Sequence, residues 1–380
     1  MHTFEVYKVY PISIVKAKGC ELTDSEGKKY LDFYGGHGVI SIGHCQDDYV
    51  KGVAEQLSTL GFYSNSVQIP QQEELAIHLT KISGYTDYKL FLCNSGAEAN
   101  ENALKLASFY TNRSKVIAFK HSFHGRTSLA VAVTDNPKIQ APVNETDKVL
   151  WAELNNIESV KALMDNDVAA VIIEGIQGVG GVQMPTTEFM KQLRELCTQN
   201  GSLLIVDEIQ SGYGRTGKFF AHQHHDVKAD IISMAKGIAN GFPVGAILIN
   251  PEIKAVFGML GTTFGGNHLG CRAAIETVKV MEKNNYVENA AKMGKYLKEK
   301  LSLNKEIKDL RGEGLIIGVE PKGNASELRD KLLFDYHIFT GFSGSVNTIR
   351  LIPPLCITKK EADMFIEAFF KATNQPLPTK

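Results

Sequence analysis

Cysteine is scarce in this sequence and never occurs as a C-x-x-C pair. Only six of the 380 residues are Cys, and they lie far apart. This spacing excludes a zinc ribbon or a disulfide framework and predicts reduced thiols. The first residues lack a basic region followed by a long apolar core, so we expect no signal peptide. No apolar run approaches the ~18 residues that a membrane-spanning helix needs, and we therefore expect a cytoplasmic protein with no membrane partner.

The sequence also lacks a surplus of charge of either sign. Its 41 Lys and Arg residues offset 42 Asp and Glu residues, which leaves a formal net charge of −1. A dedicated nucleic-acid-binding protein normally has a basic surplus, so we expect no nucleic-acid partner. The balance does not exclude a small anionic ligand in a locally basic pocket. The length suggests two or three domains at about 100–200 residues each.

Short apolar runs alternate with amphipathic stretches through the middle of the chain. Continuous Val, Ile and Leu runs separated by helices indicate a mainly parallel sheet covered on both faces. The predicted strands are residues 89–93, 115–119, 169–174, 203–208, 230–235 and 245–249, and helices are predicted over 97–110 and 187–200.

The pattern of apolar runs and amphipathic stretches changes along the chain and divides it into three parts. Residues 51–270 are predicted to form one large α/β domain. From residue 271 to 380 the pattern predicts a smaller α+β domain, which starts with one long helix over 272–302. Residues 1–50 have the pattern of strands and turns, and we expect them to join the smaller domain.

Polar or glycine-rich groups directly follow five of the apolar runs. In an open parallel sheet, ligands bind beyond the carboxyl ends of the strands, so these groups are candidates for one shared site. They are Asn94–Gly96, Ser122–Arg126, Glu174, Asp207–Glu208 and Lys236–Gly237.

The first of these junctions, Asn94–Ala97, turns from a strand into a long helix. Bare N–H groups at a helix start, approached over a glycine, suit a phosphate group. A simple cap, in which Ser95 or Asn94 serves the helix, explains the same residues and is favoured on geometry alone.

Asp207 and Lys236 end two separate apolar runs, 29 residues apart. Taken singly, a structural ion pair explains Asp207 equally well, and an exposed lysine at a strand end is the commoner interpretation of Lys236. Taken together, they match a different chemistry. A carboxylate that pairs with a pyridine nitrogen and a lysine that binds an aldehyde define a pyridoxal phosphate (PLP) site.

Two further motifs have simpler explanations. Gly212–Lys218 matches both G-x-G-x-x-G and G-x-x-x-x-G-K, which suggests a nucleotide-binding module as an alternative function. Phe219 follows where a Ser or Thr would bind Mg²⁺, and the glycines open no evident helix, so we do not expect a nucleotide there. His222–His225 suggests a metal, but no acidic or Cys partner stands at ligand spacing, and we expect a solvated loop and no metal site.

Six motifs in order resemble those of the class III PLP-dependent aminotransferases, and in particular the N-acetylornithine aminotransferases. The likeness runs from Tyr7 to Leu355. The motifs are NSGAEANENALKLA (94–107), FHGRT (123–127), EGIQGVGG (174–181), VDEIQSGYGRTGK (206–218), MAKGIANGFPVGA (234–246) and TFGGN (263–267). The resemblance implies a fold-type I PLP-dependent transferase, with a mainly parallel sheet of the seven-stranded type in its large α/β domain.

The resemblance also assigns the cofactor contacts. Lys236 would bind the PLP aldehyde and then act as the base, while Asp207 would pair with the ring nitrogen. The other expected contacts are Ser95, Gly96 and Ala97 at the phosphate, Phe123 stacked on the ring, His124 in the cofactor pocket, Gln210 at the ring hydroxyl, and Thr263 reaching in from the neighbouring subunit. A site shared in this way implies a homodimer.

For the substrates, the resemblance points to two arginines. Arg350 would bind the α-carboxylate of glutamate or 2-oxoglutarate, and Arg126 a carboxylate farther from the reacting carbon. Tyr7 would line the far end of the pocket, and Glu174 is also assigned to the substrate site. The implied reaction moves the δ-amino group of N2-acetyl-L-ornithine to 2-oxoglutarate in arginine biosynthesis, with ping-pong kinetics.

Val179 departs from the family pattern, because relatives carry a glutamate there that is thought to neutralise the arginine matching Arg350. Without it, Arg350 would stay an uncompensated cation and favour a donor with an extra negative charge, such as N2-succinyl-L-ornithine. The alternative is that Val179 is a neutral local change. Ornithine, 4-aminobutyrate or another ω-amine are further alternative donors, although the free α-amino cation of ornithine would face Arg350.

Overall fold

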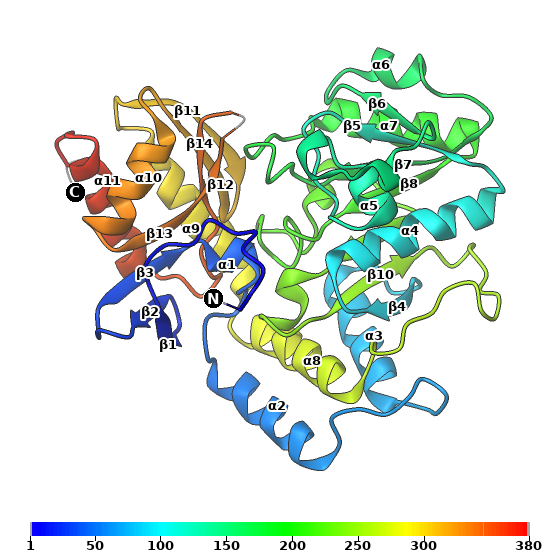
Figure 1. Ribbon diagram of the computed structural model, residues 1–380, viewed down its shortest axis with the longest axis horizontal. Helices are drawn as coiled ribbons and strands as arrows, with labels where there is room; N and C mark the ends of the chain where they lie inside the picture. The colour runs from blue at the N-terminus through cyan, green and yellow to red at the C-terminus, as the bar shows by residue number, and fades with distance from the viewer. Residues whose placement is uncertain (1, 345, 378–380) are drawn as a thin grey trace.

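Two seven-stranded sheets organise the chain, one in each of two lobes (Figure 1). The computed structural model describes residues 2–344 and 346–377. In the large lobe the strand order is β4-β10-β9-β8-β7-β5-β6. These strands are β4 (Lys89–Cys93), β5 (Lys115–Phe119), β6 (Val149–Ala152), β7 (Val168–Glu174), β8 (Leu203–Asp207), β9 (Ile231–Met234) and β10 (Gly245–Ile249).

The large sheet is mainly parallel. Strand β10 pairs antiparallel with β4 and β9, while the pairs from β9 through β8, β7 and β5 to β6 are all parallel. The predicted fold class is confirmed, and each predicted strand is present to within one or two residues. Strand β6 is not among the predicted strands, because its residues Val149–Trp151 are only partly buried at the sheet edge and form no long apolar run.

Helix α4 (Gly96–Thr111) lies across the large sheet and leads out of the end of β4. The hydroxyl of Ser95 accepts a hydrogen bond from the Glu98 N–H at 3.2 Å, and Asn112 ends the helix in the left-handed conformation. The other helices of the large lobe, and of the segments that lead into and out of it, are α2 (Asp47–Thr59), α3 (Pro70–Ser83), α5 (Ser128–Ala132), α6 (Ile157–Lys161), α7 (Thr187–Asn200) and α8 (His268–Lys283).

The second sheet draws its strands from both ends of the chain, in the order β1-β2-β3-β13-β14-β12-β11. At the centre of this sheet β3 pairs parallel with β13, which connects the N-terminal strands to the C-terminal ones. The strands are β1 (Ile14–Lys18), β2 (Glu21–Asp24), β3 (Lys29–Phe33), β11 (Ile307–Glu313), β12 (Ile316–Pro321), β13 (Ile338–Ser343) and β14 (Thr348–Leu351), and the helices beside them are α9 (Tyr286–Leu301), α10 (Ala325–Phe334) and α11 (Lys359–Ala372).

The single long helix predicted over 272–302 is wrong. The structure has α8 and α9 in its place, separated at Asn284 and Asn285. Asn285 takes the left-handed conformation with φ +51°, which asparagine tolerates better than most residues. The apolar periodicity continues on both sides of this break, so periodicity alone does not reveal it.

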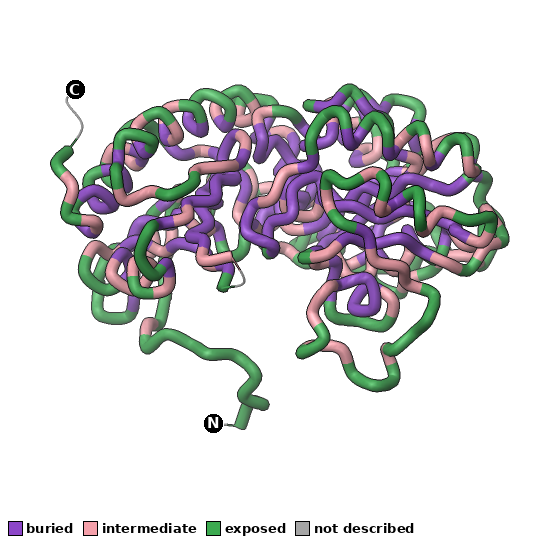
Figure 2. The backbone as a smooth tube through the Cα atoms, turned by 90° about the horizontal axis from the view of Figure 1, so that it is seen from above, coloured by how far each residue is buried: buried purple, intermediate pink, exposed green. Residues whose placement is uncertain are grey.

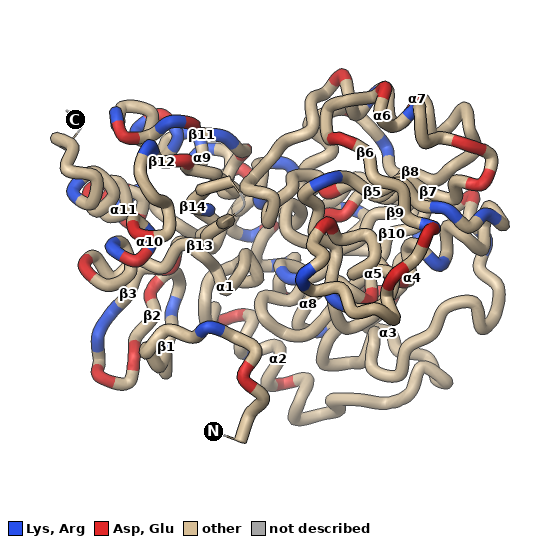
Figure 3. Tube along the Cα trace, turned by 45° about the horizontal axis from the view of Figure 1, so that its top comes forward, with Lys and Arg blue, Asp and Glu red and all other residues tan. Residues whose placement is uncertain are grey.

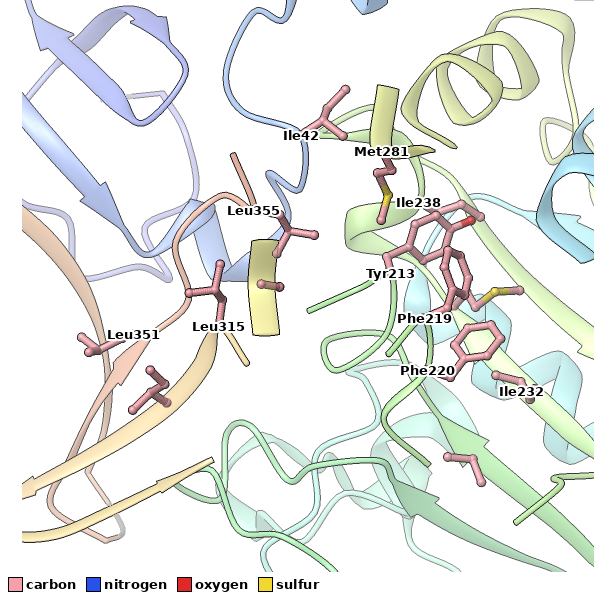
Figure 4. Close-up of a cluster of buried hydrophobic side chains, with 14 of the residues drawn as sticks. Ile42, Tyr213, Phe219, Phe220, Ile232, Ile238, Met281, Leu315, Leu351 and Leu355 are labelled. Atoms are coloured by element: carbon pink, nitrogen blue, oxygen red, sulfur yellow. The ribbon is translucent and has the colours of Figure 1, made fainter. Parts of the chain in front are cut away.

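One buried apolar cluster runs through both lobes, so that the lobes share a core (Figures 2 and 4). Figure 4 shows Tyr213, Phe219 and Phe220 on one side of the junction and Leu315 and Leu355 on the other. The loop Gly212–Lys218 therefore begins inside this core.

The glycine-rich loop Gly212–Lys218 is part of the junction between the lobes. Arg215 is fully buried and donates hydrogen bonds to the backbone carbonyl of Leu315 at 3.2 Å and to that of Pro353. Burial lowers the pKa of Arg215 to about 10. A Cβ at Gly217 would stand 2.7 Å from the Cβ of Ala291 in α9, so the glycine permits close packing. This packing explains the motif without a nucleotide.

Replacing Gly217 by Ala is expected to lower the free energy of unfolding by about 2–4 kcal/mol, because the new Cβ meets α9 and φ is +83°. Gly27 is the matched control, since it has φ +82° with nothing within 4 Å of a Cβ. Chemical denaturation of both variants separates the contact from the conformational strain. Equal losses in the two variants would contradict the assigned role of the loop, and stabilisation of the wild type by ATP would support the nucleotide hypothesis.

No helix among residues 2–344 and 346–377 is long and apolar enough to cross a membrane. Lys, Arg, Asp and Glu are interspersed over both lobes (Figure 3).

Candidate active site

A cavity of about 300 Å³ lies beyond the carboxyl ends of β4, β7, β8 and β9. Its size is at the lower end of the range of small-molecule sites. The lining includes ten of the residues that the sequence singles out, namely Ser95, Gly96, Ala97, Phe123, His124, Glu174, Val179, Asp207, Gln210 and Lys236. Residues from separate strand ends thus converge on one hollow, as the parallel sheet predicts.

Lys236 stands directly after β9 and Ala235, where it opens the short 3₁₀ turn Lys236–Ala239. Its φ of +50° is in the left-handed region, and holding a non-glycine residue there costs about 1–3 kcal/mol. Burial lowers the pKa of the Lys236 amine, and the carboxylates of Asp207 and Glu174 oppose this shift. The net direction favours the neutral amine, which is the form that attacks an aldehyde.

Asp207, at the end of β8, is 4% exposed and receives three hydrogen bonds. The donors are His124 Nδ1 at 2.8 Å and Asn100 Nδ2 at 2.7 Å, both to Oδ2, and the Ile209 N–H at 2.9 Å to Oδ1. A buried carboxylate satisfied in this way can stay charged without an ion-pair partner.

The start of α4 is capped by a side chain and also borders the cavity. Ser95 caps the helix through its hydroxyl, and Ser95, Gly96 and Ala97 also line the cavity. A Cβ at Gly245 would lie 2.2 Å from the Ser95 carbonyl oxygen, so this turn packs tightly against β10. The helix N-terminus is thereby held toward the cavity, where its dipole favours a bound phosphate.

Glu174, at the end of β7, fixes two backbone segments at the cavity wall. Its carboxylate accepts hydrogen bonds from the Phe123 N–H at 2.9 Å and the Gly178 N–H at 3.2 Å. Burial raises the pKa of Glu174 to about 7; His124 lowers it and Asp207 raises it further. Glu174 therefore positions the Phe123 backbone as well as facing the cavity.

The raised pKa of Glu174 predicts a pH-dependent loss of stability. An unfolded glutamate ionises near its usual value of 4.5, whereas the folded one keeps its proton to about 7. Stability from this group is therefore complete below pH 4.5 and lost as pH rises through 7, by about 3 kcal/mol. We expect cofactor-free Glu174→Gln protein to lack this loss in urea denaturation between pH 5 and 8. Parallel pH profiles for variant and wild type would contradict the prediction.

Arg350 lies in β14, next to the lining residue Gln210, and is 5% exposed. Its Nη1 donates to Gln210 Oε1 at 3.5 Å, and its Nε has no hydrogen-bond partner within the described part of the chain. The Gln210 side chain also donates to the backbone carbonyl of His37 at 2.9 Å. Gln210, which lines the cavity, thus links it to Arg350 and to the His37 backbone. Arg126 is exposed, with its guanidinium 5.8 Å from the centre of the Phe123 ring.

Four predicted site residues, Tyr7, Arg126, Thr263 and Arg350, are not among the residues that line this chain's cavity. Tyr7 is 80% exposed in the N-terminal segment, and Thr263 is exposed in the loop after β10. The neighbouring Thr262 accepts a hydrogen bond from Asn94 Nδ2 at 3.2 Å through its hydroxyl oxygen.

The segment His222–His225, where we expect no metal, contacts an acidic side chain that the sequence analysis did not anticipate. His222 is fully buried, with Nδ1 2.7 Å from Glu208 Oε1 and Nε2 2.5 Å from the Tyr85 hydroxyl. The solvated loop expected there is wrong for His222 and His225, which are both buried. No metal-binding group of three or more His, Cys, Asp or Glu side chains occurs in the residues that the structure describes.

Asn100 is the main contact that the sequence prediction missed. It stands four residues after Gly96 in α4, and that spacing places both residues on one face of the helix. The helical spacing was therefore the available signal.

These residues fit PLP in charge and shape. The cavity combines a helix N-terminus for a phosphate, a buried carboxylate for a ring nitrogen and a lysine for an aldehyde. His124 Nε2 and Arg350 Nε are buried without hydrogen-bond partners in the structure as described, so the site holds unused polar capacity.

Comparisons with known proteins identify the family. The model of the aminotransferase class-III family matches residues 4–373. Acetylornithine aminotransferase of Archaeoglobus fulgidus is 41% identical over 96% of this chain and 96% of that protein. Two solved structures of ornithine aminotransferase from Toxoplasma gondii superpose with TM-scores of 0.92 and 0.91 at 29% identity, covering 98% of this chain and 92% of theirs. One of them is described with partial occupancy of PLP at its active site. The chain therefore belongs to the class III aminotransferase family, whose members depend on PLP.

Proposed function

We propose that this enzyme moves the δ-amino group of N2-acetyl-L-ornithine to 2-oxoglutarate, giving N-acetylglutamate 5-semialdehyde and L-glutamate in arginine biosynthesis. The observation that carries the proposal is the likeness to acetylornithine aminotransferases at 38–41% identity over nearly the full chain. The structural relatives named for ornithine are less similar, at 29% identity. A cavity lined by Lys236 and Asp207, with Arg350 in contact with the lining residue Gln210, supports the same reaction.

The side chains divide the chemistry between them. PLP, when bound, supplies an aldehyde for the substrate amine and a ring that withdraws electrons. The Lys236 amine would hold the cofactor aldehyde and would move a proton to and from the reacting carbon. Asp207 would balance positive charge at the ring nitrogen, and Phe123 would pack on the ring. Arg350 and Arg126 orient carboxylates of the substrates through bidentate pairing.

We also propose that the enzyme acts as a cytoplasmic homodimer in which Thr263 completes the partner's phosphate site. An exposed apolar patch supports this interface, since such patches mark interaction surfaces. It lies on α2, on the segment that follows α2 and on the loop that carries Thr263. Its members are Leu57, Leu60, Phe62, Tyr63, Val67 and Phe264. The cytoplasmic location is supported by the six cysteines, which are all free.

Steady-state kinetics with each donor test the substrate assignment. We expect glutamate formation from N2-acetyl-L-ornithine and 2-oxoglutarate to give parallel double-reciprocal lines, with kcat/KM at least about tenfold above that for ornithine or 4-aminobutyrate. A higher kcat/KM for either of those amines would overturn the assignment while leaving the family unchanged.

N2-Succinyl-L-ornithine is a second candidate donor, and one observation favours it. Val179 lines the cavity, and within the described residues no Asp or Glu side chain lies at ion-pair distance from Arg350, on which Glu174 acts only from farther away. An extra donor carboxylate would compensate this cation. We expect Val179→Glu to reduce kcat/KM for the succinyl donor about tenfold more than for the acetyl donor, with Val179→Gln as the uncharged control. Equal effects of both variants on both donors would contradict this candidate.

A further inference from the structure

A buried chain of hydrogen bonds stands behind Asp207 and does not touch the cavity. It consists of Ser233, in β9, and Asn100, in α4, which are both 0% exposed. Ser233 Oγ donates to Asn100 Oδ1 at 2.6 Å, and Asn100 Nδ2 donates to Asp207 Oδ2 at 2.7 Å. In the register of the sheet, Ser233 is also the residue directly opposite Asp207.

The orientation of the Asn100 amide is fixed by its surroundings. Its NH₂ group meets two acceptors, Asp207 Oδ2 and the His124 carbonyl oxygen, both at 2.7 Å. A flipped amide would turn its oxygen toward both of these oxygens. The Oδ1 atom therefore faces Ser233, whose hydroxyl satisfies it by donating, and no buried polar atom of Asn100 is left unpaired.

These contacts leave one acceptor position on Asp207. A carboxylate has about four lone-pair positions. Asn100 and His124 occupy both positions of Oδ2, and the Ile209 N–H occupies one position of Oδ1. Because Asp207 lines the cavity, the remaining Oδ1 position is the one available to a ligand. Each of the three partners donates, so the carboxylate is the acceptor in every one of these contacts.

We propose that Asn100 and Ser233 are positioning residues that hold Asp207 as an acceptor and aim its last free position at the PLP ring nitrogen. This inference rests on the proposed function for its cofactor and not for its amine donor. His124, Glu174 and Lys236 are the other titratable groups around Asp207. None of them contacts Asn100 through its side chain among the described contacts, so Asn100 can be changed without removing them.

The first test replaces the Asn100 amide with side chains of similar size. We expect Asn100→Leu to lower kcat about 10–100-fold and to weaken PLP binding about tenfold, with KM for 2-oxoglutarate changed less than twofold. Asn100→Asp can donate to Asp207 only when the introduced carboxyl is protonated. Its PLP dissociation constant, divided by that of wild type, should therefore fall at least about fivefold between pH 8.5 and pH 6. A packing role would give a ratio that does not change with pH.

A matched pair at Ser233 isolates the hydroxyl, because Ser233→Thr and Ser233→Val add nearly the same volume and differ in the oxygen. We expect kcat of the Val variant to be about 3–10-fold below that of the Thr variant, and its visible cofactor band to titrate at a different pH. Thermal melting verifies that each variant is folded.

Equal kcat and equal spectra in the Thr and Val variants, or a pH-independent ratio for Asn100→Asp, would overturn the proposal. Wild-type protein that binds PLP but ignores acylated ornithines would overturn only the donor assignment. Wild-type protein that binds no PLP would overturn both.

Discussion

Replacing Lys236 with Ala is expected to abolish transamination while the protein remains folded. The loss in kcat should reach about four orders of magnitude or more, because in the proposed reaction one side chain both binds the cofactor aldehyde and transfers the proton. The side chain lies at the cavity in a strained left-handed turn, and burial lowers the pKa of its amine. Truncation removes a half-buried amine and no packing of the core.

Lys218→Ala is the control for this experiment. Lys218 is exposed at the end of the glycine-rich loop and lines no part of the cavity. Turnover is followed as glutamate formation, and folding as the thermal melting temperature. The Lys218 variant should keep the wild-type rate. Residual turnover of Lys236→Ala above about one per cent would mean that another base serves the reaction.

Replacing Asp207 with Asn is expected to lower kcat by about two to three orders of magnitude. The introduced amide has nearly the same shape but carries no charge, so it cannot balance a protonated ring nitrogen. Its NH₂ group must also face a donor or the cavity, since Asn100, His124 and Ile209 all donate to the native carboxylate. We expect weaker PLP binding and a shifted visible band in the same variant.

Asp226→Asn is the matched control, because Asp226 is exposed and its left-handed φ of +54° suits asparagine. Activity of Asp207→Asn within tenfold of wild type would show that the ring nitrogen needs no carboxylate. A collapse of its melting temperature would show that the effect is on folding. The test would then use Asp207→Glu, which keeps the carboxylate.

The strands of the large sheet and the residues at their ends could be predicted from the sequence, because buried parallel strands are continuous apolar runs. Asp207 and Lys236 end two of these runs, and the structure brings both to one cavity. The edge strand β6 and the break at Asn285 could not be predicted, since a half-buried strand has no apolar run and a single left-handed residue leaves the helical periodicity intact.

The hydrogen bonds behind Asp207 were not predicted, although helical spacing places Asn100 on the same face of α4 as Gly96. Asn100 is an ordinary polar residue within a helix until α4 is placed against β8 and β9, where its amide meets Asp207. The same holds for the glycine-rich loop Gly212–Lys218, whose spacing matches a phosphate-binding motif. Its function in the lobe junction depends on Arg215 and on contacts with residues about 75–140 positions later in the chain.

The visible absorption spectrum of purified protein, before and after addition of N2-acetyl-L-ornithine without 2-oxoglutarate, tests the central claim most directly. We predict a visible band of bound PLP that bleaches on adding this donor, returns on adding 2-oxoglutarate, and is lost in Lys236→Ala. Repeating the addition with N2-succinyl-L-ornithine and ornithine ranks the donors. A band that persists with every acylated ornithine would contradict the donor, and PLP-supplemented protein without any such band would contradict the assignment of Lys236.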